Sequence, residues 1–124
     1  MSSETWLITG GSGMIGSNII KQLLAKGHTC ISFDNKSAYP FDSEKEFGIS
    51  NLDNLIFVKA DINDKDAVLK SWNGVDRVVH GAAYADVAGC VENYDVDFKV
   101  NVIGTQNILE SSLESNIKHF TFIF

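Results

Sequence analysis

The chain has 124 residues, enough for one domain with a hydrophobic core, and its 44% hydrophobic and 21% charged residues are ordinary for a globular protein. A net charge of −6 argues against nucleic acid or an anionic membrane surface as a partner, since phosphate groups bind to basic faces. No apolar run reaches the roughly 18 residues of a membrane span, the first residues do not resemble a signal peptide, and Cys30 and Cys90 match no metal-binding spacing. We therefore expect a cytoplasmic protein with reduced thiols, no bound metal and no membrane segment.

The first predicted elements are a strand over residues 5–9, a glycine-rich turn, and a helix that begins near Gly16 and ends before Gly27. A short β-branched, apolar run predicts the strand, and apolar residues that recur every three or four positions predict the helix. The turn matches both G-x-G-x-x-G and T-G-x-x-G-x-x-G, through Thr9, Gly10, Gly11, Gly13 and Gly16. Glycine there permits a tight turn, lets backbone N–H groups approach a pyrophosphate, and lets the helix pack closely on the strand. Because a helix N-terminus also attracts phosphate, this stretch predicts a dinucleotide-binding site.

An acidic residue follows at the distance that such a site requires. Residues 28–33 predict the second strand, and Asp34 comes directly after it, eighteen residues past Gly16. A carboxylate in that place is expected to hold the hydroxyl groups of the adenosine ribose. It also repels the additional phosphate of NADP, by on the order of 4 kcal/mol per like charge at about 4 Å before screening by salt. We therefore predict NAD as the cofactor and NADP as the less favoured one, with the nearby Lys36 softening that preference.

The rest of the chain continues to alternate between strands and helices. Further strands are expected over residues 55–60, 75–80 and 119–124, and further helices over residues 44–47, 64–72 and 98–115. The nearly continuous apolar character of residues 55–60 is typical of a buried parallel strand, and Asn63 or Asp64 is expected to cap the helix that follows. Residues 84–97 predict a loop that leads into the last helix. The apolar face of that helix is formed by Val102, Ile103, Ile108, Leu109 and Leu113.

Strands that alternate with helices predict one α/β domain over residues 1–124, built on a doubly wound parallel sheet of the Rossmann-like type. The expected strand order is 3-2-1-4-5. A nucleotide binds at the carboxyl ends of the first and fourth strands, where that order reverses. Residues 10–14 and 81–83 follow those two strands in the sequence, so both segments are expected to face the cofactor.

Five motifs occur in the chain in a characteristic order: residues 9–16 (TGGSGMIG), Asp34, residues 60–62 (ADI), residues 80–83 (HGAA) and residues 101–110 (NVIGTQNILE). Together they resemble the extended short-chain dehydrogenase/reductase family, which includes NAD-dependent nucleotide-sugar epimerases and dehydratases. Residues 79–89 also resemble the 3β-hydroxysteroid and sterol dehydrogenase branch of that family. The resemblance implies hydride transfer between NAD and a hydroxyl-bearing substrate, and it leaves the substrate class open between a nucleotide sugar and a sterol.

The resemblance also implies which residues contact the cofactor. The predicted contacts are Gly10, Gly11, Ser12, Gly13, Met14, Ile15, Gly16, Asp34, Asn35, Asp61, Ile62, Ala82, Ala83, Tyr84 and Asn101. Asp61 and Ile62 would border the adenine, and Ala82 and Ala83 would line the nicotinamide ribose. Asp61 has the alternative role of capping the next helix. Asn101 either makes an internal hydrogen bond or approaches the nicotinamide, and His80 is expected to be structural rather than catalytic.

Members of this family use a Ser or Thr after the fifth strand and a Tyr-x-x-x-Lys pair further on, and the chain ends at Phe124 before any of them. None of its three tyrosines is followed by lysine four residues later. We therefore predict no catalytic residue in this chain and NAD binding without turnover. Four hypotheses stay open: part of a longer enzyme, part of a split enzyme, a non-catalytic nucleotide-binding or redox-sensing module, or a truncated chain without a function of its own. The apolar residues 119–124 would form an exposed sheet edge, which predicts self-association through the last strand.

Overall fold

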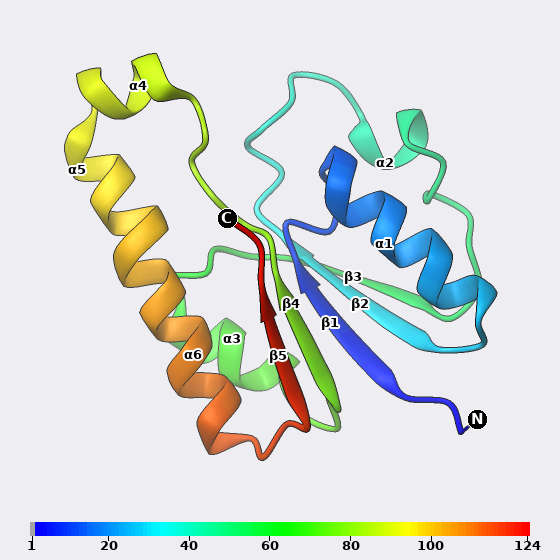
Figure 1. Cartoon of the computed structure of the whole chain (residues 1–124). Helices are drawn as coiled ribbons and strands as arrows, with labels where there is room; N and C mark the ends of the chain where they lie inside the picture. The colour runs from blue at the N-terminus through cyan, green and yellow to red at the C-terminus, as the bar shows by residue number, and fades with distance from the viewer. Residues whose placement is uncertain (1) are drawn as a thin grey trace.

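The computed structural model describes residues 2–124 and contains a five-stranded parallel sheet in the order β3-β2-β1-β4-β5 (Figure 1). The strands are β1 (Thr5–Thr9), β2 (Thr29–Asp34), β3 (Leu55–Lys59), β4 (Arg77–His80) and β5 (His119–Phe122). The helices are α1 (Met14–Ala25), α2 (Ser43–Glu46), α3 (Lys65–Ser71), α4 (Val87–Glu92), α5 (Tyr94–Asp97) and α6 (Thr105–Glu114), with a π-helical segment, η1 (Phe98–Gly104), directly before α6. The predicted Rossmann-like fold and its strand order are therefore confirmed.

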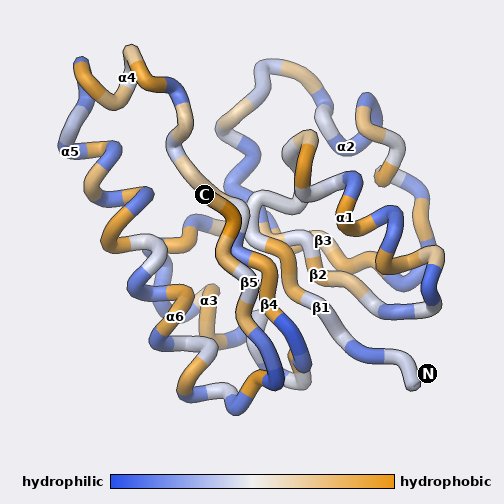
Figure 2. The backbone as a smooth tube through the Cα atoms, viewed as in Figure 1, coloured by the Kyte–Doolittle hydropathy of each residue, from blue (hydrophilic) through white to orange (hydrophobic). Residues whose placement is uncertain are grey.

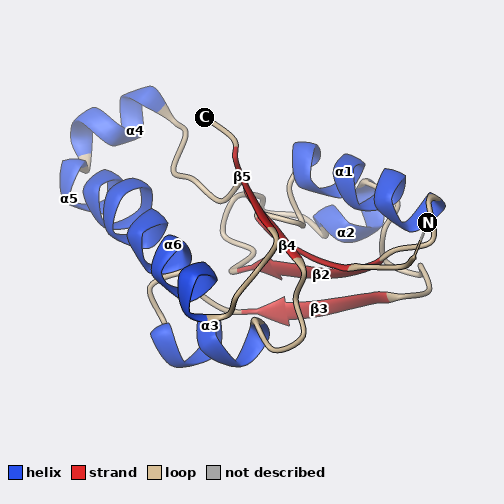
Figure 3. Ribbon diagram, turned by 60° about the horizontal axis from the view of Figure 1, so that its bottom comes forward, coloured by secondary structure: helices blue, strands red, loops and turns tan. Residues whose placement is uncertain are grey.

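Helices lie on both faces of the sheet, with α1 and α2 on one face and α3 and α6 on the other (Figures 1 and 3). Side chains that alternate along the central strand β1 divide the core between these faces. Leu7 packs in the cluster that contains Trp72 of the α3 side and Ile108 of α6. Ile8 packs in the cluster that contains Ile20 of α1. Because full burial of such a side chain is worth roughly 1.5–3 kcal/mol, these two clusters hold both helical layers against the sheet.

The burial predicted for the third strand is wrong. Ile56 and Phe57 of β3 are 54% and 41% exposed, although β3 pairs in parallel with β2 over its whole length. A parallel strand is buried on both faces only where other elements cover both of them. Strand β3 lies at the edge of the sheet, and the side chains of Ile56 and Phe57 remain accessible there.

The face predicted for the last helix is also wrong. Of the five apolar residues expected to face the core, only Ile108 is buried, and Leu113 is 81% exposed. The buried side of α6 carries mostly small or polar residues, namely Asn107, Ile108, Ser111 and Ser112. These residues let α6 approach α3 closely, and the Ser112 hydroxyl accepts a hydrogen bond from Trp72 Nε1 (3.1 Å). Figure 2 shows the hydrophobic residues of this helix alternating with polar ones along its length.

The segment expected to be a loop over residues 84–97 contains two short helices, α4 and α5. They continue through η1 into α6 and project beyond the carboxyl ends of the strands (Figure 1). The predicted helix over residues 98–115 is thus a π-helical segment followed by an α-helix. Single π-helical turns within helices occur frequently at functional sites.

Within residues 2–124, no helix has the length and apolar character needed to span a membrane. At the edge of the sheet opposite β3, strand β5 pairs with β4 on one side only. Phe122 at the end of β5 is 49% exposed.

Candidate dinucleotide-binding site

The glycine-rich turn connects β1 to α1 at the centre of the sheet. Gly10 has a φ of +72°, a left-handed conformation that glycine adopts without steric cost, and its N–H donates to the carbonyl of Phe33 (2.8 Å). Gly16 lies so close to the backbone of Gly10 and Gly11 that a Cβ atom at this position would overlap both. The turn therefore needs glycine at Gly10 for its conformation and at Gly16 for the close approach of helix and strand, as the motif predicts.

The N-terminus of α1 opens directly from this turn. Gly13 is its N-cap residue and, as a glycine, supplies no side-chain acceptor for the N–H groups of the first turn. The exposed side chains of Met14 and Ile15 flank this helix end. Unpaired N–H groups and the positive end of the helix dipole favour an anion here. These groups fit the pyrophosphate of a dinucleotide.

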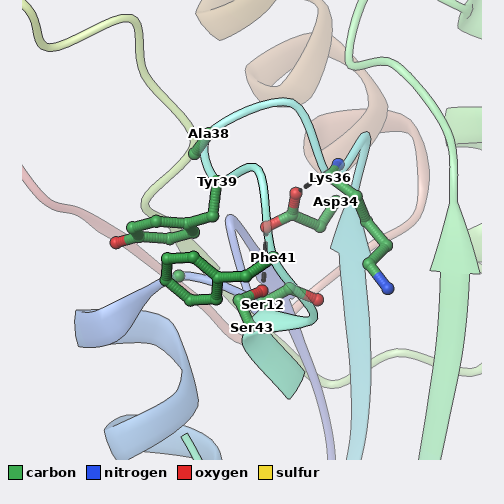
Figure 4. A pocket seen from close by; sticks show the side chains of 8 residues that line it. Ser12, Asp34, Lys36, Ala38, Tyr39, Phe41 and Ser43 are labelled. Carbon is green, nitrogen blue, oxygen red and sulfur yellow. Dashed lines mark hydrogen bonds between the residues drawn. The ribbon is translucent and has the colours of Figure 1, made fainter. Parts of the chain in front are cut away.

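Asp34 is fixed at the end of β2, beside the turn (Figure 4). Its Oδ2 accepts a hydrogen bond from the backbone N–H of Ser12 (3.0 Å), and its Oδ1 accepts one from the N–H of Lys36 (2.7 Å). Lys36 has a φ of +62°, which turns the chain so that its N–H faces the carboxylate. Each oxygen of a carboxylate has a second acceptor position. Asp34 is thus oriented by the protein and retains the capacity to accept hydrogen bonds from two ribose hydroxyl groups.

Aromatic side chains from the loop after β2 border the cavity beside Asp34. The rings of Tyr39 and Phe41 lie 5.0 Å apart, and both line a cavity that also contacts Ser12, Asp34 and Ser43 (Figure 4). A second cavity, on the other side of Asp34, lies between this site and the end of β3. The loop after β2 therefore forms one wall of the cavity beside Asp34.

The segment after β4 is held in place by Thr9 and His80. The Thr9 hydroxyl oxygen accepts hydrogen bonds from the N–H groups of Gly81 (3.0 Å) and Ala82 (3.1 Å), so its hydrogen is donated to His80 Nδ1 (2.6 Å). The other ring nitrogen, Nε2, then carries the hydrogen and donates it to Thr105 Oγ1 (3.0 Å). His80 is fully buried, and burial lowers its pKa from 6.5 to about 4. The structure thus places His80 in a structural role, as the sequence analysis expects.

Asn101 holds the loop that carries Ala83 and Tyr84. Its Oδ1 accepts from the N–H of Tyr84 (2.9 Å), and its Nδ2 donates to the Tyr84 carbonyl (3.0 Å) and to Asp97 (2.6 Å). Of the two alternatives for Asn101, the structure shows the internal hydrogen bonds. The residue lies in η1, so this side chain connects the π-helical segment to the loop after β4.

Asp61 and Ile62 follow β3 and have different environments. Asp61 is exposed, and its Oδ1 accepts from the N–H of Asn63 (2.8 Å). The cap of α3 is Asp64, which accepts from the N–H of Ala67, so the alternative role of Asp61 as that cap is wrong. Ile62 is 6% exposed and packs in the hydrophobic core.

The fold brings most of the predicted site residues to one edge of the sheet. The carboxyl ends of β1 and β4 are followed by residues 10–16 and by residues 82–84. Strand β2 ends at Asp34 and is followed by Asn35. Asn101 joins them through the loop at Tyr84. Sequence reasoning missed Glu44, whose carboxylate accepts a hydrogen bond from the Ser12 hydroxyl (2.6 Å). Nothing in the local pattern of residues 42–47 signals this contact, because its partner lies 32 residues earlier in the chain.

Comparison with known proteins agrees with this geometry. Residues 6–124 match the model of the NAD dependent epimerase/dehydratase family, and the chain belongs to that family. It is 36% identical over 121 residues to a putative UDP-glucose 4-epimerase of Methanocaldococcus jannaschii, covering 94% of this chain and 36% of the relative. It is 32% identical over 120 residues to a 3-beta-hydroxysteroid dehydrogenase of Mycolicibacterium neoaurum, covering 94% of this chain and 30% of the relative.

A solved structure of Thermus thermophilus UDP-glucose 4-epimerase in complex with NAD superposes with a TM-score of 0.80 and 30% identity. The match covers 94% of this chain and 36% of that one. The chain therefore spans about a third of the length of these relatives. The resemblance to an NAD-dependent family is confirmed.

Proposed function

We propose that this chain is the NAD-binding part of an oxidoreductase or epimerase that acts on a nucleotide sugar by hydride transfer. The observation that carries the proposal is the fixed carboxylate of Asp34 beside the open N-terminus of α1. In this assignment Asp34 binds the adenosine ribose, the turn at Gly10–Gly16 binds the pyrophosphate, and residues 82–84 face the nicotinamide ribose. Bound NAD would accept and return a hydride at a carbon that bears a hydroxyl group.

The preference for NAD over NADP is part of this proposal. Asp34 places a negative charge where the additional phosphate of NADP would lie, and the family is NAD-dependent. The remaining predicted contacts, Ser12, Met14, Ile15, Asn35, Asp61, Ile62 and Asn101, are proposed as supports of the same site. Asn101 supports it through the backbone of Tyr84. We also propose that the protein functions in the cytoplasm, where the free thiols of Cys30 and Cys90 stay reduced.

The test is titration of the 124-residue chain with NAD in an isothermal calorimeter. We expect saturable binding with one site per chain, and weaker binding in Asp34→Ala, because the ribose hydroxyl groups lose their acceptor. Circular dichroism spectra of both proteins provide the control for folding. Absence of heat for NAD, in a chain whose spectrum shows the helices and strands, would refute the proposal.

We further propose that the 124-residue chain binds NAD without turning over substrate and that its domain is incomplete. The support is that the Tyr-x-x-x-Lys pair of the family does not occur in its sequence and that no Ser or Thr follows residue 122 in it. Incubation with NAD and UDP-glucose, followed by chromatography of the sugar nucleotides, tests this prediction. Formation of UDP-galactose by the purified chain would contradict it, and formation only with added cell extract would favour a split enzyme.

A sterol is the second candidate substrate of the parent enzyme. The match to a 3-beta-hydroxysteroid dehydrogenase is the observation that favours it. Activity of a longer protein that contains this sequence, assayed with UDP-glucose and with a 3β-hydroxysteroid in parallel, separates the two candidates. The third candidate is a non-catalytic nucleotide-binding or redox-sensing module. It requires that the source cell produce a protein of 13.6 kDa that binds NAD.

Self-association through residues 119–124 is proposed for the 124-residue chain. The support is the unpaired outer edge of β5, which carries Phe122 half-exposed and has no charged residue after His119. Such an edge can pair with the same strand of a second copy. Size-exclusion chromatography with light scattering at increasing concentration should show a dimer or larger species. A constant mass of 13.6 kDa would contradict it.

A further inference from the structure

Glu44 connects the glycine-rich turn to Lys36, which lies two residues after the end of β2, by hydrogen bonds. Its Oε2 accepts from the hydroxyl of Ser12 (2.6 Å), and its Oε1 accepts from the ammonium group of Lys36 (2.9 Å). Ser12 is 2% exposed, and the side chains of Glu44 and Lys36 are 16% and 31% exposed. Both oxygens of the Glu44 carboxylate therefore accept a hydrogen bond from a residue beside Asp34.

The backbone of the same serine also bonds to Asp34. The N–H of Ser12 donates to Asp34 Oδ2 and the hydroxyl of Ser12 donates to Glu44 Oε2, so two carboxylates converge on one residue. Together with Lys36, they line one cavity of about 220 Å³ that opens toward the end of β3. A phosphate attached to the ribose 2′-oxygen would enter this region, because Asp34 binds that oxygen in the proposed NAD site.

The ammonium group of Lys36, a cation beside this region, already forms an ion pair. Lys36 is the residue that could attract a phosphate at this position, but its ammonium group is paired with Glu44. That hydrogen bond raises the pKa of Lys36 further above its usual value. The side chain of Lys36 also extends away from the rings of Tyr39 and Phe41 (Figure 4). The softening of the NAD preference that the sequence predicts for Lys36 is thus opposed by a contact that the sequence does not reveal.

We propose that Glu44 is a specificity-determining residue that excludes NADP, by adding a second negative charge beside Asp34 and by holding the ammonium group of Lys36. This inference rests on the proposed NAD site. It makes Glu44, which lies in α2 and outside the glycine motif, a separate determinant of cofactor choice. Asp34 alone would leave Lys36 able to compensate a 2′-phosphate.

The experiment measures the dissociation constants of NAD and NADP by calorimetry for wild type and for Glu44→Gln. Glutamine retains an oxygen that accepts from the Ser12 hydroxyl, so the variant removes the negative charge and keeps this hydrogen bond. We expect the ratio of the NADP constant to the NAD constant to fall by about tenfold, with the NAD constant nearly unchanged. Lys59, which also lines the cavity, is present in both proteins, so its contribution cancels in this ratio.

Two further variants assign the effect to this contact. Glu46→Gln removes the same charge from an exposed position of α2 that makes no side-chain hydrogen bond in residues 2–124, and it should leave the ratio within about twofold. Lys36→Met in the Glu44→Gln background should restore most of the discrimination, because the released ammonium group is gone. Melting temperatures confirm that each variant is folded.

The outcomes separate this inference from the proposed function. Wild-type binding of NAD with an unchanged ratio in Glu44→Gln would overturn the role of Glu44 and leave the NAD site standing. An equal fall of the ratio in Glu46→Gln would also overturn it, because the effect would then belong to the net charge of the chain. Failure of the folded wild type to bind NAD would overturn both proposals.

Discussion

Protonation of His80 is expected to destabilise the fold in a defined pH window. His80 is fully buried and its pKa is lowered from 6.5 to about 4, so the unfolded chain binds a proton at a pH where the folded chain does not. The unfolded state is therefore favoured as the pH falls through 6.5, and the loss of stability is complete near pH 4. With these two pKa values, His80 alone lowers the free energy of unfolding by about 2 kcal/mol between pH 7 and pH 5.

The physical reason lies in the hydrogen bonds of the ring. Nδ1 accepts the hydrogen of the Thr9 hydroxyl, whose oxygen is occupied by the N–H groups of Gly81 and Ala82. A proton on Nδ1 would have no acceptor there and would place a charge in the core. Urea unfolding at pH 7 and pH 5 measures the effect, by comparing wild type with His80→Gln and with the exposed His119→Gln. We expect the pH-dependent loss to be about 2 kcal/mol smaller in His80→Gln only. Equal losses in all three proteins would refute this reasoning.

Four substitutions test the packing of the glycine turn, of the loop at Tyr84 and of α6. Gly16→Ala should lower the free energy of unfolding by about 1–3 kcal/mol in urea titrations, because its Cβ would overlap the turn backbone; an unchanged midpoint would mean that the turn can relax. Asn101→Ala should cost about 1–3 kcal/mol and speed proteolysis after residue 84, because both backbone groups of Tyr84 lose their partner; equal proteolysis rates would contradict this role. Ile108→Ala should cost about 2–5 kcal/mol and Leu113→Ala less than about 0.5 kcal/mol, and similar melting temperatures for both would contradict the orientation of α6.

The fold could be predicted because each strand and each turn has a recognisable local sequence pattern. Strand β1 and the turn after it are encoded in consecutive residues, and the order of the sheet follows from the rule for doubly wound folds. The face of α6 could not be predicted in this way. Its apolar residues recur at helical spacing, but the side that packs on α3 contains Ser112, which accepts a hydrogen bond from Trp72, forty residues away in the chain. Helical periodicity gives a face without saying which neighbour meets it.

The candidate site likewise has one part that local sequence predicts and one part that only the structure shows. The glycine turn and Asp34 could be predicted because backbone conformation and spacing restrict the residues allowed there. The two alternatives for Asn101 needed the structure, since its partner Tyr84 belongs to another element. Glu44 needed it even more, because a glutamate in a short helix is ordinary for a solvent-exposed position. Contacts between distant side chains depend on the packed fold, and sequence spacing alone does not contain them.

The central claim is that NAD binds at the carboxyl edge of the sheet with its adenosine on Asp34. Titration of the ¹⁵N-labelled chain with NAD, followed by two-dimensional NMR, tests it most directly. We expect the amide signals of residues 10–16, 34–36 and 82–84 to shift together, with one dissociation constant. Shifts confined to the exposed edge at β5, or no shifts in a well-dispersed spectrum, would contradict it.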